Sequence, residues 1–384
     1  MFESFFLAGF ECATGYNVNN EWIDQIAATQ HDANVSEDYR RLSDLGIRAA
    51  REAVRWPLVD KNGQFDFSSL APFVAAGREQ GIELIYDLFH FGYPEGVDLF
   101  APDFPERFAE YCYAAAHYIS NRSDGPLYFT PVNEPSFFSW AAGEAGLFAP
   151  HQHERGWELK VNLVRALIKG IDAIHSACKD ARIVNADSMC RVVAPANRWD
   201  LAKAAHEFNT ISVFQSWDML CGRLLPELGG SPRHLDIVGI NYYWTNQWEI
   251  HCPGVPLRDD DPRRQTLSQI VKYVWKRYGH EMLITETSHV DDMRPVWMSE
   301  LADEAEKLLH SDIPLRGICL YPVLGMPEWH APDRWTQMGL WELIDREGKL
   351  VREPHLPMID SLSEAQSRIE QTDLRLKVAG SRYR

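Results

Sequence analysis

Short apolar runs and longer amphipathic segments alternate along the whole chain. The apolar runs are bounded by turn residues, which is the pattern of a buried strand. Eight of them are predicted as strands, at 5–10, 48–54, 82–89, 127–132, 182–186, 235–240, 282–285 and 317–321. Strands that alternate with helices in this way are typical of an α/β fold with a parallel sheet.

The segments between the runs are predicted as helices, and capping residues mark some of their ends. Ser36 is a candidate N-cap for a helix that ends at Leu45, before Gly46. Pro295 suits the first turn of a helix over 295–310. Further helices are predicted over 68–80, 105–120, 157–179, 262–278 and from 357 onward, with short helices in 191–231.

Eight strand–helix units in one chain predict a (β/α)8 TIM barrel. No Gly/Ser-rich linker divides the sequence, so we expect a single domain over residues 1–384. The basic segment at about 372–384 is predicted as a frayed tail.

Composition narrows the classes of partner. A net charge of −17 argues against a nucleic acid or an anionic membrane surface and leaves a neutral sugar open. The seven cysteines have no C-x-x-C spacing, so neither a disulfide framework nor a metal site is expected, and no cofactor is called for. The N-terminus carries Glu3 and lacks a basic region, unlike a signal peptide, and no run is long enough to span a membrane. A cytoplasmic location is therefore expected, and a homo-oligomer is compatible with the sequence.

Two of the predicted strands end on a carboxylate. The strand at 127–132 runs into Asn133-Glu134-Pro135, and Pro135 stops it because proline cannot donate to a sheet ladder. The strand at 282–285 runs into Glu286. In one parallel barrel both carboxylates lie on the same face, and two facing carboxylates are what glycoside hydrolysis requires.

Other strand ends carry hydrogen-bonding and aromatic residues, and a barrel places its active site at these ends. They include Arg51, Asp87, His90, Asp187, Asn241, Tyr243 and Tyr321, with Glu328 and Trp329 after the last strand. A solvated rim would carry Lys, Glu and Ser instead. The coincidence across several strands supports a functional site more strongly than any single residue.

Three blocks make this sequence resemble a family 1 glycoside hydrolase, or a close relative in the clan with catalytic Glu on strands four and seven. Residues 129–135 resemble the family's Asn-Glu-Pro block, 236–243 its Gly-Ile-Asn-Tyr-Tyr block, and 283–286 its Ile-Thr-Glu block. Asn-Glu-Pro alone is a weak signal, whereas all three in this order are highly specific. The resemblance covers most of the chain through short blocks separated by unmatched stretches.

The resemblance implies a retaining β-glycosidase of the β-glucosidase or β-galactosidase type that hydrolyses a terminal β-linked sugar. Glu286 would be the nucleophile and Glu134 the acid/base. The implied substrate-binding and supporting residues are Arg51, His90, Asn133, Asn241, Tyr243, Glu328 and Trp329. A carbohydrate or glycoside is the implied substrate.

The sequence departs from the family's pattern in several places. The replacements are Thr287-Ser288 after the nucleophile, Phe91 after the histidine and Tyr321 on strand eight, where the family has Asn-Gly, Trp and Trp. The family's sugar-binding Gln near the first strand has no clear match, and Glu11 or Asn17 is the candidate for its place. These changes leave the identity of the sugar open.

Three alternatives remain. An endo-acting retaining glycanase of the same clan would need an open cleft, whereas a Glu328-Trp329 grip on a terminal sugar favours exo action. A non-catalytic sugar-binding barrel is less consistent with two retained carboxylates. A metal-dependent barrel hydrolase would rely on the H-x-H spacing of His151 and His153.

Overall fold

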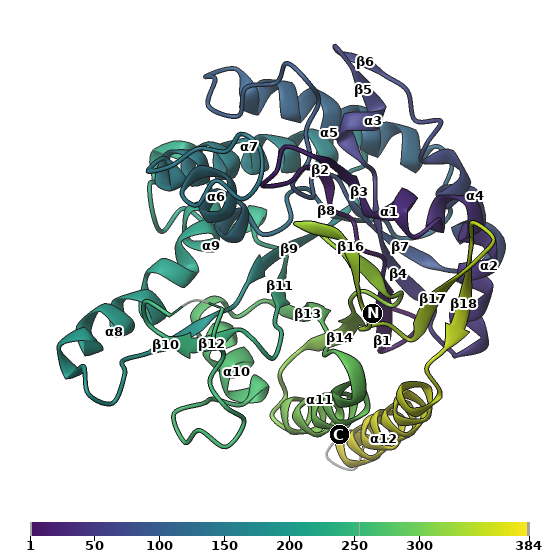
Figure 1. The fold of residues 1–384 in the computed structure, drawn as a ribbon, viewed down its shortest axis with the longest axis vertical. Helices are drawn as coiled ribbons and strands as arrows, with labels where there is room; N and C mark the ends of the chain where they lie inside the picture. Colours follow the sequence, from purple (N-terminus) through teal and green to yellow (C-terminus); the bar gives the residue numbers. More distant parts are fainter. Residues whose placement is uncertain (1, 253, 382–384) are drawn as a thin grey trace.

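The computed structural model describes residues 2–252 and 254–381. Within them, eight parallel strands close into a barrel, which confirms the predicted fold (Figure 1). In order around the barrel they are β1 (Phe6–Gly9), β4 (Ala49–Ala53), β7 (Glu83–Asp87), β8 (Tyr128–Thr130), β9 (Arg182–Ser188), β11 (Ile237–Asn241), β13 (Glu281–Thr287) and β14 (Leu315–Leu320). The last strand pairs in parallel with the first.

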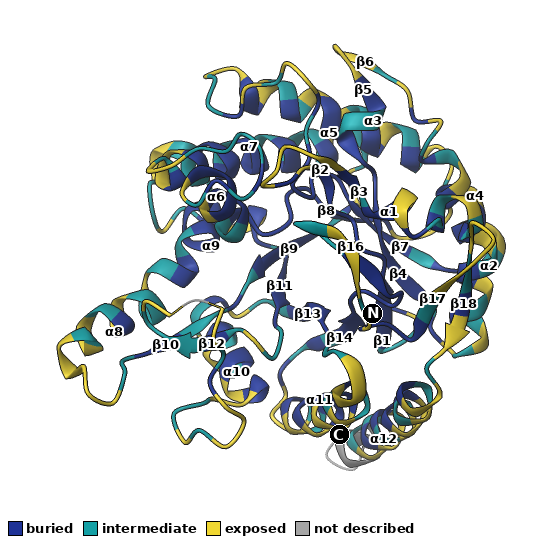
Figure 2. Ribbon diagram, in the orientation of Figure 1, coloured by how far each residue is buried: buried dark blue, intermediate teal, exposed yellow. Residues whose placement is uncertain are grey.

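A layer of helices covers the outside of the barrel. Its members are α2 (His31–Asp44), α4 (Ala71–Gln80), α5 (Phe104–Ser120), α7 (Gly156–Ala177), α10 (Leu267–Tyr278), α11 (Arg294–Leu309) and α12 (Leu356–Ser381). The strands are dark blue and the outer helix faces yellow in Figure 2, so the core lies inside the barrel and beneath the helices. Burial on both faces explains why the strands read as continuous apolar runs. No helix among the described residues has the length and apolar content to span a membrane.

Several predicted helix boundaries differ from the structure. α2 begins at His31, so Ser36 lies inside the helix and does not cap it. The reason is tertiary, because buried acidic partners hold the His31 side chain and extend the helix toward its N-terminus. The final helix extends to Ser381, past the start of the predicted frayed tail, and residues 382–384 lie outside the described part of the chain.

The face at the carboxyl ends of the barrel strands carries elements that the sequence pattern does not reveal. A hairpin of β2 (Thr14–Tyr16) and β3 (Trp22–Asp24) follows the first strand, and α6 (Pro135–Gly143) follows β8. A second hairpin, β15 (Met326–Glu328) and β16 (Ala331–Thr336), follows the last strand and lies across the barrel in the view of Figure 1. β16 is mostly exposed and lacks apolar alternation, so it gives no strand signal.

A side lobe extends from the segments after β9 and β11. The lobe contains β10 (Arg191–Val193), which pairs with β12 (Gln247–Glu249), and α8 (Ala202–Thr210). Figure 1 shows these elements beside the barrel, next to α10. The two strands are three residues each, which is too short for a periodic pattern in the sequence.

Candidate active site

Glu134 and Glu286 both lie at the carboxyl end of the barrel. Glu134 follows β8 and caps α6, with a left-handed backbone at φ 44° and Pro135 in the first helical turn. The backbone amide of Glu134 donates to the carbonyl of Ala186 over 3.0 Å. The carbonyl of Glu286 accepts from the amide of Tyr242, the residue after the neighbouring strand β11, over 2.9 Å. The two residues are only 8% and 4% exposed, respectively. Their placement on one face agrees with the predicted pairing.

The carboxylate of Glu286 receives a donor on each oxygen. Arg51 Nη1 donates to Oε1 over 2.6 Å, and the Tyr243 hydroxyl donates to Oε2 over 2.9 Å. A guanidinium and a hydroxyl are partners that stabilise a negative charge. The arrangement therefore suits Glu286 to act as an ionised group.

Arg51 joins several parts of the site. Its side chain is fully buried, and Nη2 donates to Asp87 Oδ2 over 2.5 Å and to Asn133 Oδ1 over 2.7 Å. The guanidinium also lies 5.3 Å from the ring centre of Tyr321. A buried cation needs such compensation, and here Asp87 and Glu286 supply two negative charges.

The environment of Glu134 favours the protonated form. Burial raises its pKa well above the usual range, and the negative charge of Glu286 raises it further. Asn241 opposes this effect, since its Nδ2 donates to Glu134 Oε1 over 2.9 Å. The Asn241 amide is fixed in turn by the hydroxyl of Thr285, which donates to its Oδ1 over 2.5 Å. The two carboxyl groups thus have different surroundings.

His90, Asn133 and Glu11 form a polar wall beside this pair. His90 Nδ1 lies 2.8 Å from Asp87 Oδ2, and His90 Nε2 lies 3.2 Å from Asn133 Nδ2 and 3.6 Å from Glu11 Oε1. Burial lowers the pKa of His90, but Asp87 and the other nearby carboxylates outweigh it and raise the pKa overall. Burial raises the pKa of Glu11 to about 7, against the opposing effect of His90.

Glu328 and Trp329 lie on the β15–β16 hairpin. Glu328 Oε2 accepts from Arg334 over 2.6 Å, and its side chain is 39% exposed. The Trp329 ring packs 5.6 Å from that of Phe91, and its carbonyl accepts from Asn17 over 2.9 Å. Asn17 thus supports the hairpin, while Glu11 faces the site. The sugar-binding role of the hairpin residues stays a prediction.

Sequence reasoning missed part of the support for the site. Asp187 at the end of β9 is fully buried; it accepts from the amide of Ser136 over 3.2 Å and from the hydroxyl of Ser216. Its charge contributes to the raised pKa of Glu134. The sequence shows Asp187 as a polar residue at the end of a predicted strand, whereas its contact with Ser216 depends on tertiary packing. Nothing in the sequence marked Thr285 as the residue that fixes Asn241.

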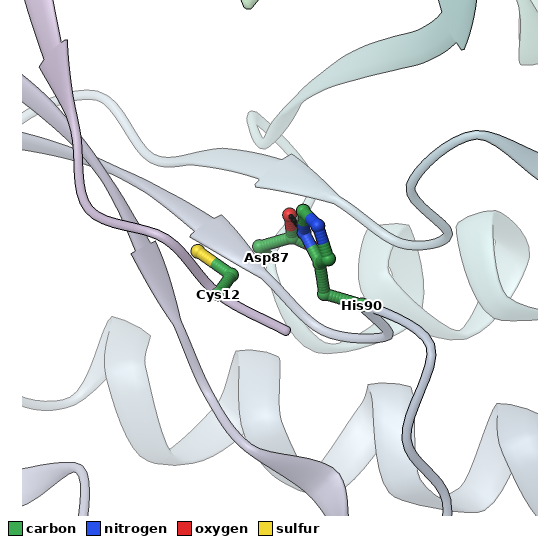
Figure 3. A group of neighbouring side chains, drawn as sticks. All are labelled: Cys12, Asp87 and His90. Atoms are coloured by element: carbon green, nitrogen blue, oxygen red, sulfur yellow. Dashed lines mark hydrogen bonds and ion pairs between the residues drawn. The ribbon is translucent and has the colours of Figure 1, made fainter. Parts of the chain in front are cut away.

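The described residues contain one group with metal-ligand geometry, Cys12, Asp87 and His90, whose ligand atoms lie within 4.8 Å of one another (Figure 3). Arg51 donates to the same Asp87 oxygen that lies beside His90, so a permanent positive charge already occupies this position. Burial also raises the pKa of the Cys12 thiol well above its usual range, which disfavours the thiolate. This group fits an ion-pair network better than a metal centre.

The H-x-H segment gives no support to a metal centre. His151 Nδ1 lies 3.2 Å from the carbonyl of Gly146, and His153 Nδ1 lies 3.2 Å from that of Glu144. Neither histidine belongs to a group of possible metal ligands in the described residues.

Comparison of the whole fold identifies similar structures. The sequence matches no protein-family profile and no curated protein. The fold is similar to a family 1 β-glucosidase from Thermotoga maritima, with a TM-score of 0.76 and 16% identity over 96% of this chain and 98% of that chain. The Thermotoga maritima β-glucosidase in complex with noeuromycin or deoxynojirimycin matches with a TM-score of 0.75, 17% identity and the same coverage. At this identity the similarity establishes the shared barrel fold.

Proposed function

We propose that this protein is a retaining β-glycosidase that releases a terminal β-linked sugar by double displacement. The observation that carries the proposal is the contrast between two buried carboxyl groups at the barrel mouth. Burial raises the pKa of Glu134, while Arg51 and Tyr243 donate to both oxygens of Glu286. One group is thus set up as a proton donor and the other as a nucleophile.

In the first step, Glu286 attacks the anomeric carbon while Glu134 gives its proton to the departing glycosidic oxygen. The product is a glycosyl ester on Glu286, which no longer carries a negative charge. Because that charge helps to raise the pKa of Glu134, its loss makes Glu134 more acidic. Glu134 is then suited to take a proton from water, which attacks the ester and releases the sugar.

The polar wall is suited to hold the sugar. In this proposal the Nδ2 of Asn133 contacts the 2-hydroxyl, an interaction that strengthens in the transition state. Arg51 fixes the other end of that amide by donating to Oδ1 over 2.7 Å. His90 and Glu11, the other members of the wall, offer further hydrogen-bonding groups to the sugar.

An endo-acting glycanase with the same two carboxyl groups is the second candidate. The observation that favours it is the ion pair of Glu328 with Arg334, because a carboxylate engaged at 2.6 Å is less free to grip a terminal sugar. Comparing short nitrophenyl glycosides with long β-glycans separates the two modes of action. Faster release of internal fragments from a β-glycan than of nitrophenol from the short glycosides would favour an endo-acting glycanase.

A panel of nitrophenyl β-glycosides tests the proposed function directly. We expect turnover of at least one gluco-, galacto-, fuco- or xylo-configured compound, and its loss in Glu286→Gln. Chelators should leave the rate unchanged. A folded protein without turnover on any member, or on β-glycans, would reject the proposal and favour a sugar-binding barrel.

A further inference from the structure

An open groove of about 440 Å³ lies between the segment that follows β9 and the exposed side of α10. Its wall carries three cationic side chains, Arg191, Lys272 and Lys276, and an exposed aromatic ring, Tyr273. None of its lining residues, all within the described chain, is acidic. In a protein with a net charge of −17, such a wall is a local reversal of sign.

The three cations are not engaged with carboxylates. The Arg191 side chain is half-buried, and its Nη1 donates to the carbonyl of Arg263 over 2.8 Å. Among the described residues, no carboxylate lies within ion-pair distance of Arg191, Lys272 or Lys276. Burial lowers the pKa of Arg191, as expected for a cation without a counter-charge. A half-buried guanidinium of this kind favours an anionic ligand.

Two lining residues of the groove, Met189 and Cys190, link it to the surroundings of the proposed acid/base. The amide of Met189, which lines the groove, donates over 3.0 Å to the carbonyl of Asn241, whose side chain holds Glu134. Cys190 also lines the groove; burial, followed by the charge of Glu134, raises the pKa of its thiol to about 12. Because Glu134 would protonate the leaving oxygen, the Cys190 end of the groove lies toward the leaving-group side of the site.

We propose that this groove binds the acidic end of the leaving group, and that the preferred substrates are β-glycosides whose aglycone carries an anionic group. Lys272 and Lys276 lie one helical turn apart on α10 and face the same groove as Arg191. Tyr273, which also lines the groove, offers a ring for an aromatic or sugar aglycone. The inference rests on the proposed glycosidase activity, and it names the substrate class of that site.

The test compares matched acidic and neutral aglycones on the sugar that the nitrophenyl panel identifies. The probes are the 4-carboxyphenyl and 4′-carboxybiphenyl glycosides and their methyl esters. The measured quantity is the ratio of kcat/KM for acid to that for ester, compared between protein variants so that differences in leaving-group ability cancel. We expect the ratio to fall about three- to tenfold in Lys272→Gln and in Arg191→Gln, the size of charge-assisted contacts at a partly exposed site.

Controls separate the loss of an anion-binding cation in the groove from the loss of a positive charge elsewhere on the protein. Lys179→Gln removes an exposed lysine at the other end of the barrel and should leave the ratio unchanged. The wild-type ratio should also fall in 0.5 M salt, because screening weakens exposed charge pairs. Lys272→Glu should lower the ratio more than Lys272→Gln.

The failures of the two proposals are distinguishable. Turnover of the neutral esters with the same acid-to-ester ratio in wild type, Lys272→Gln and Arg191→Gln would overturn the groove proposal and leave the glycosidase intact. If no glycoside is turned over, calorimetry with biphenyl-4-carboxylate and its neutral amide tests the groove directly. Selective binding of the acid that Lys272→Gln weakens supports an anion site, and equal or absent binding overturns it.

Discussion

Asn241 donates its side-chain amide to the carboxyl group of Glu134 over 2.9 Å. This hydrogen bond stabilises the charged carboxylate, so it lowers a pKa that burial and the charge of Glu286 raise. Asn241 therefore limits how far the proton affinity of Glu134 can rise. The hydroxyl of Thr285 keeps the amide in the orientation that makes this possible.

Replacing Asn241 should change the pH dependence as well as the rate. In Asn241→Ala the pKa of Glu134 should rise, because a bond to its charged form is lost. Since Glu134 must begin protonated, the alkaline limb of kcat/KM against pH should move to higher pH. Thr285→Val should produce a smaller shift in the same direction. A limb that stays in place would show that Asn241 does not control this proton.

The two carboxyl groups should respond differently to isosteric amides. Glu286→Gln should abolish turnover of every substrate, because no glycosyl ester can form. Glu134→Gln should slow substrates with poor leaving groups by about 10²–10⁴-fold and spare activated aryl glycosides, which need little protonation. Steady-state rates on dinitrophenyl and alkyl glycosides measure the contrast. Equal losses on both would argue against the acid role.

The configuration at the anomeric carbon should be retained. We expect NMR of the first-formed sugar to show the β-anomer, and a crystal structure to place the carboxyl groups about 5–5.5 Å apart. Initial formation of the α-anomer, or a separation near ~9 Å, would instead indicate direct attack by water.

The ion pair on the β15–β16 hairpin provides a test of how Glu328 is used. If Glu328 contacts the sugar O4 and O6, Glu328→Ser should lower kcat/KM for glucosides or galactosides more than for xylosides, which lack O6. Arg334→Gln removes the ion-pair partner at 2.6 Å and leaves Glu328 in place, so it should raise kcat/KM for glucosides and galactosides. A uniform loss across all sugars in Glu328→Ser would assign it a purely structural role.

A buried histidine outside the proposed site should make the stability of the protein depend on pH. His31 lies 2.8 Å from both Asp38 and Glu52; burial lowers its pKa, but these carboxylates outweigh it and raise the pKa to about 9. A group whose pKa is higher in the folded state than in the unfolded state stabilises the fold fully below the unfolded value of about 6.5. That contribution, on the order of 3 kcal/mol, is lost as pH rises through about 9.

Denaturant unfolding of wild type and His31→Gln between pH 6 and 10 measures this contribution. The difference in unfolding free energy should be largest at the acidic end and shrink toward pH 10. Asp38 is also held by Arg352 over 2.8 Å, so Arg352→Gln should destabilise the protein at all these pH values. A difference independent of pH would mean that His31 is not charged in the native protein.

The sequence was most informative where strand ends carry chemistry. Glu134 and Glu286 could each be found because an apolar run stops at a polar residue and a parallel barrel gathers these ends on one face. Arg51, expected at a strand end, lies in the middle of β4. Side-chain contacts between strands could not be predicted from the sequence, because the hydrogen bond of Thr285 with Asn241 depends on the register of β11 against β13.

Elements with weak periodicity were also missed. Ser36 looked like a cap, but the contacts of His31 with its acidic partners decide where α2 begins. The sequence does not predict the basic groove, because Arg191 and Lys272 lie 81 positions apart and line one groove only when the side lobe folds beside α10.

The left-handed backbone at Glu134 has a consequence for the stability of the chain. A non-glycine residue at φ 44° costs about 1–3 kcal/mol, so glycine at this position would relieve the strain and remove the carboxyl group together. If Glu134 is the acid/base that we propose, the residue that would be easiest on the backbone at this position is one that cannot catalyse the reaction. Glu134→Gly should then stabilise the fold while it removes the activity.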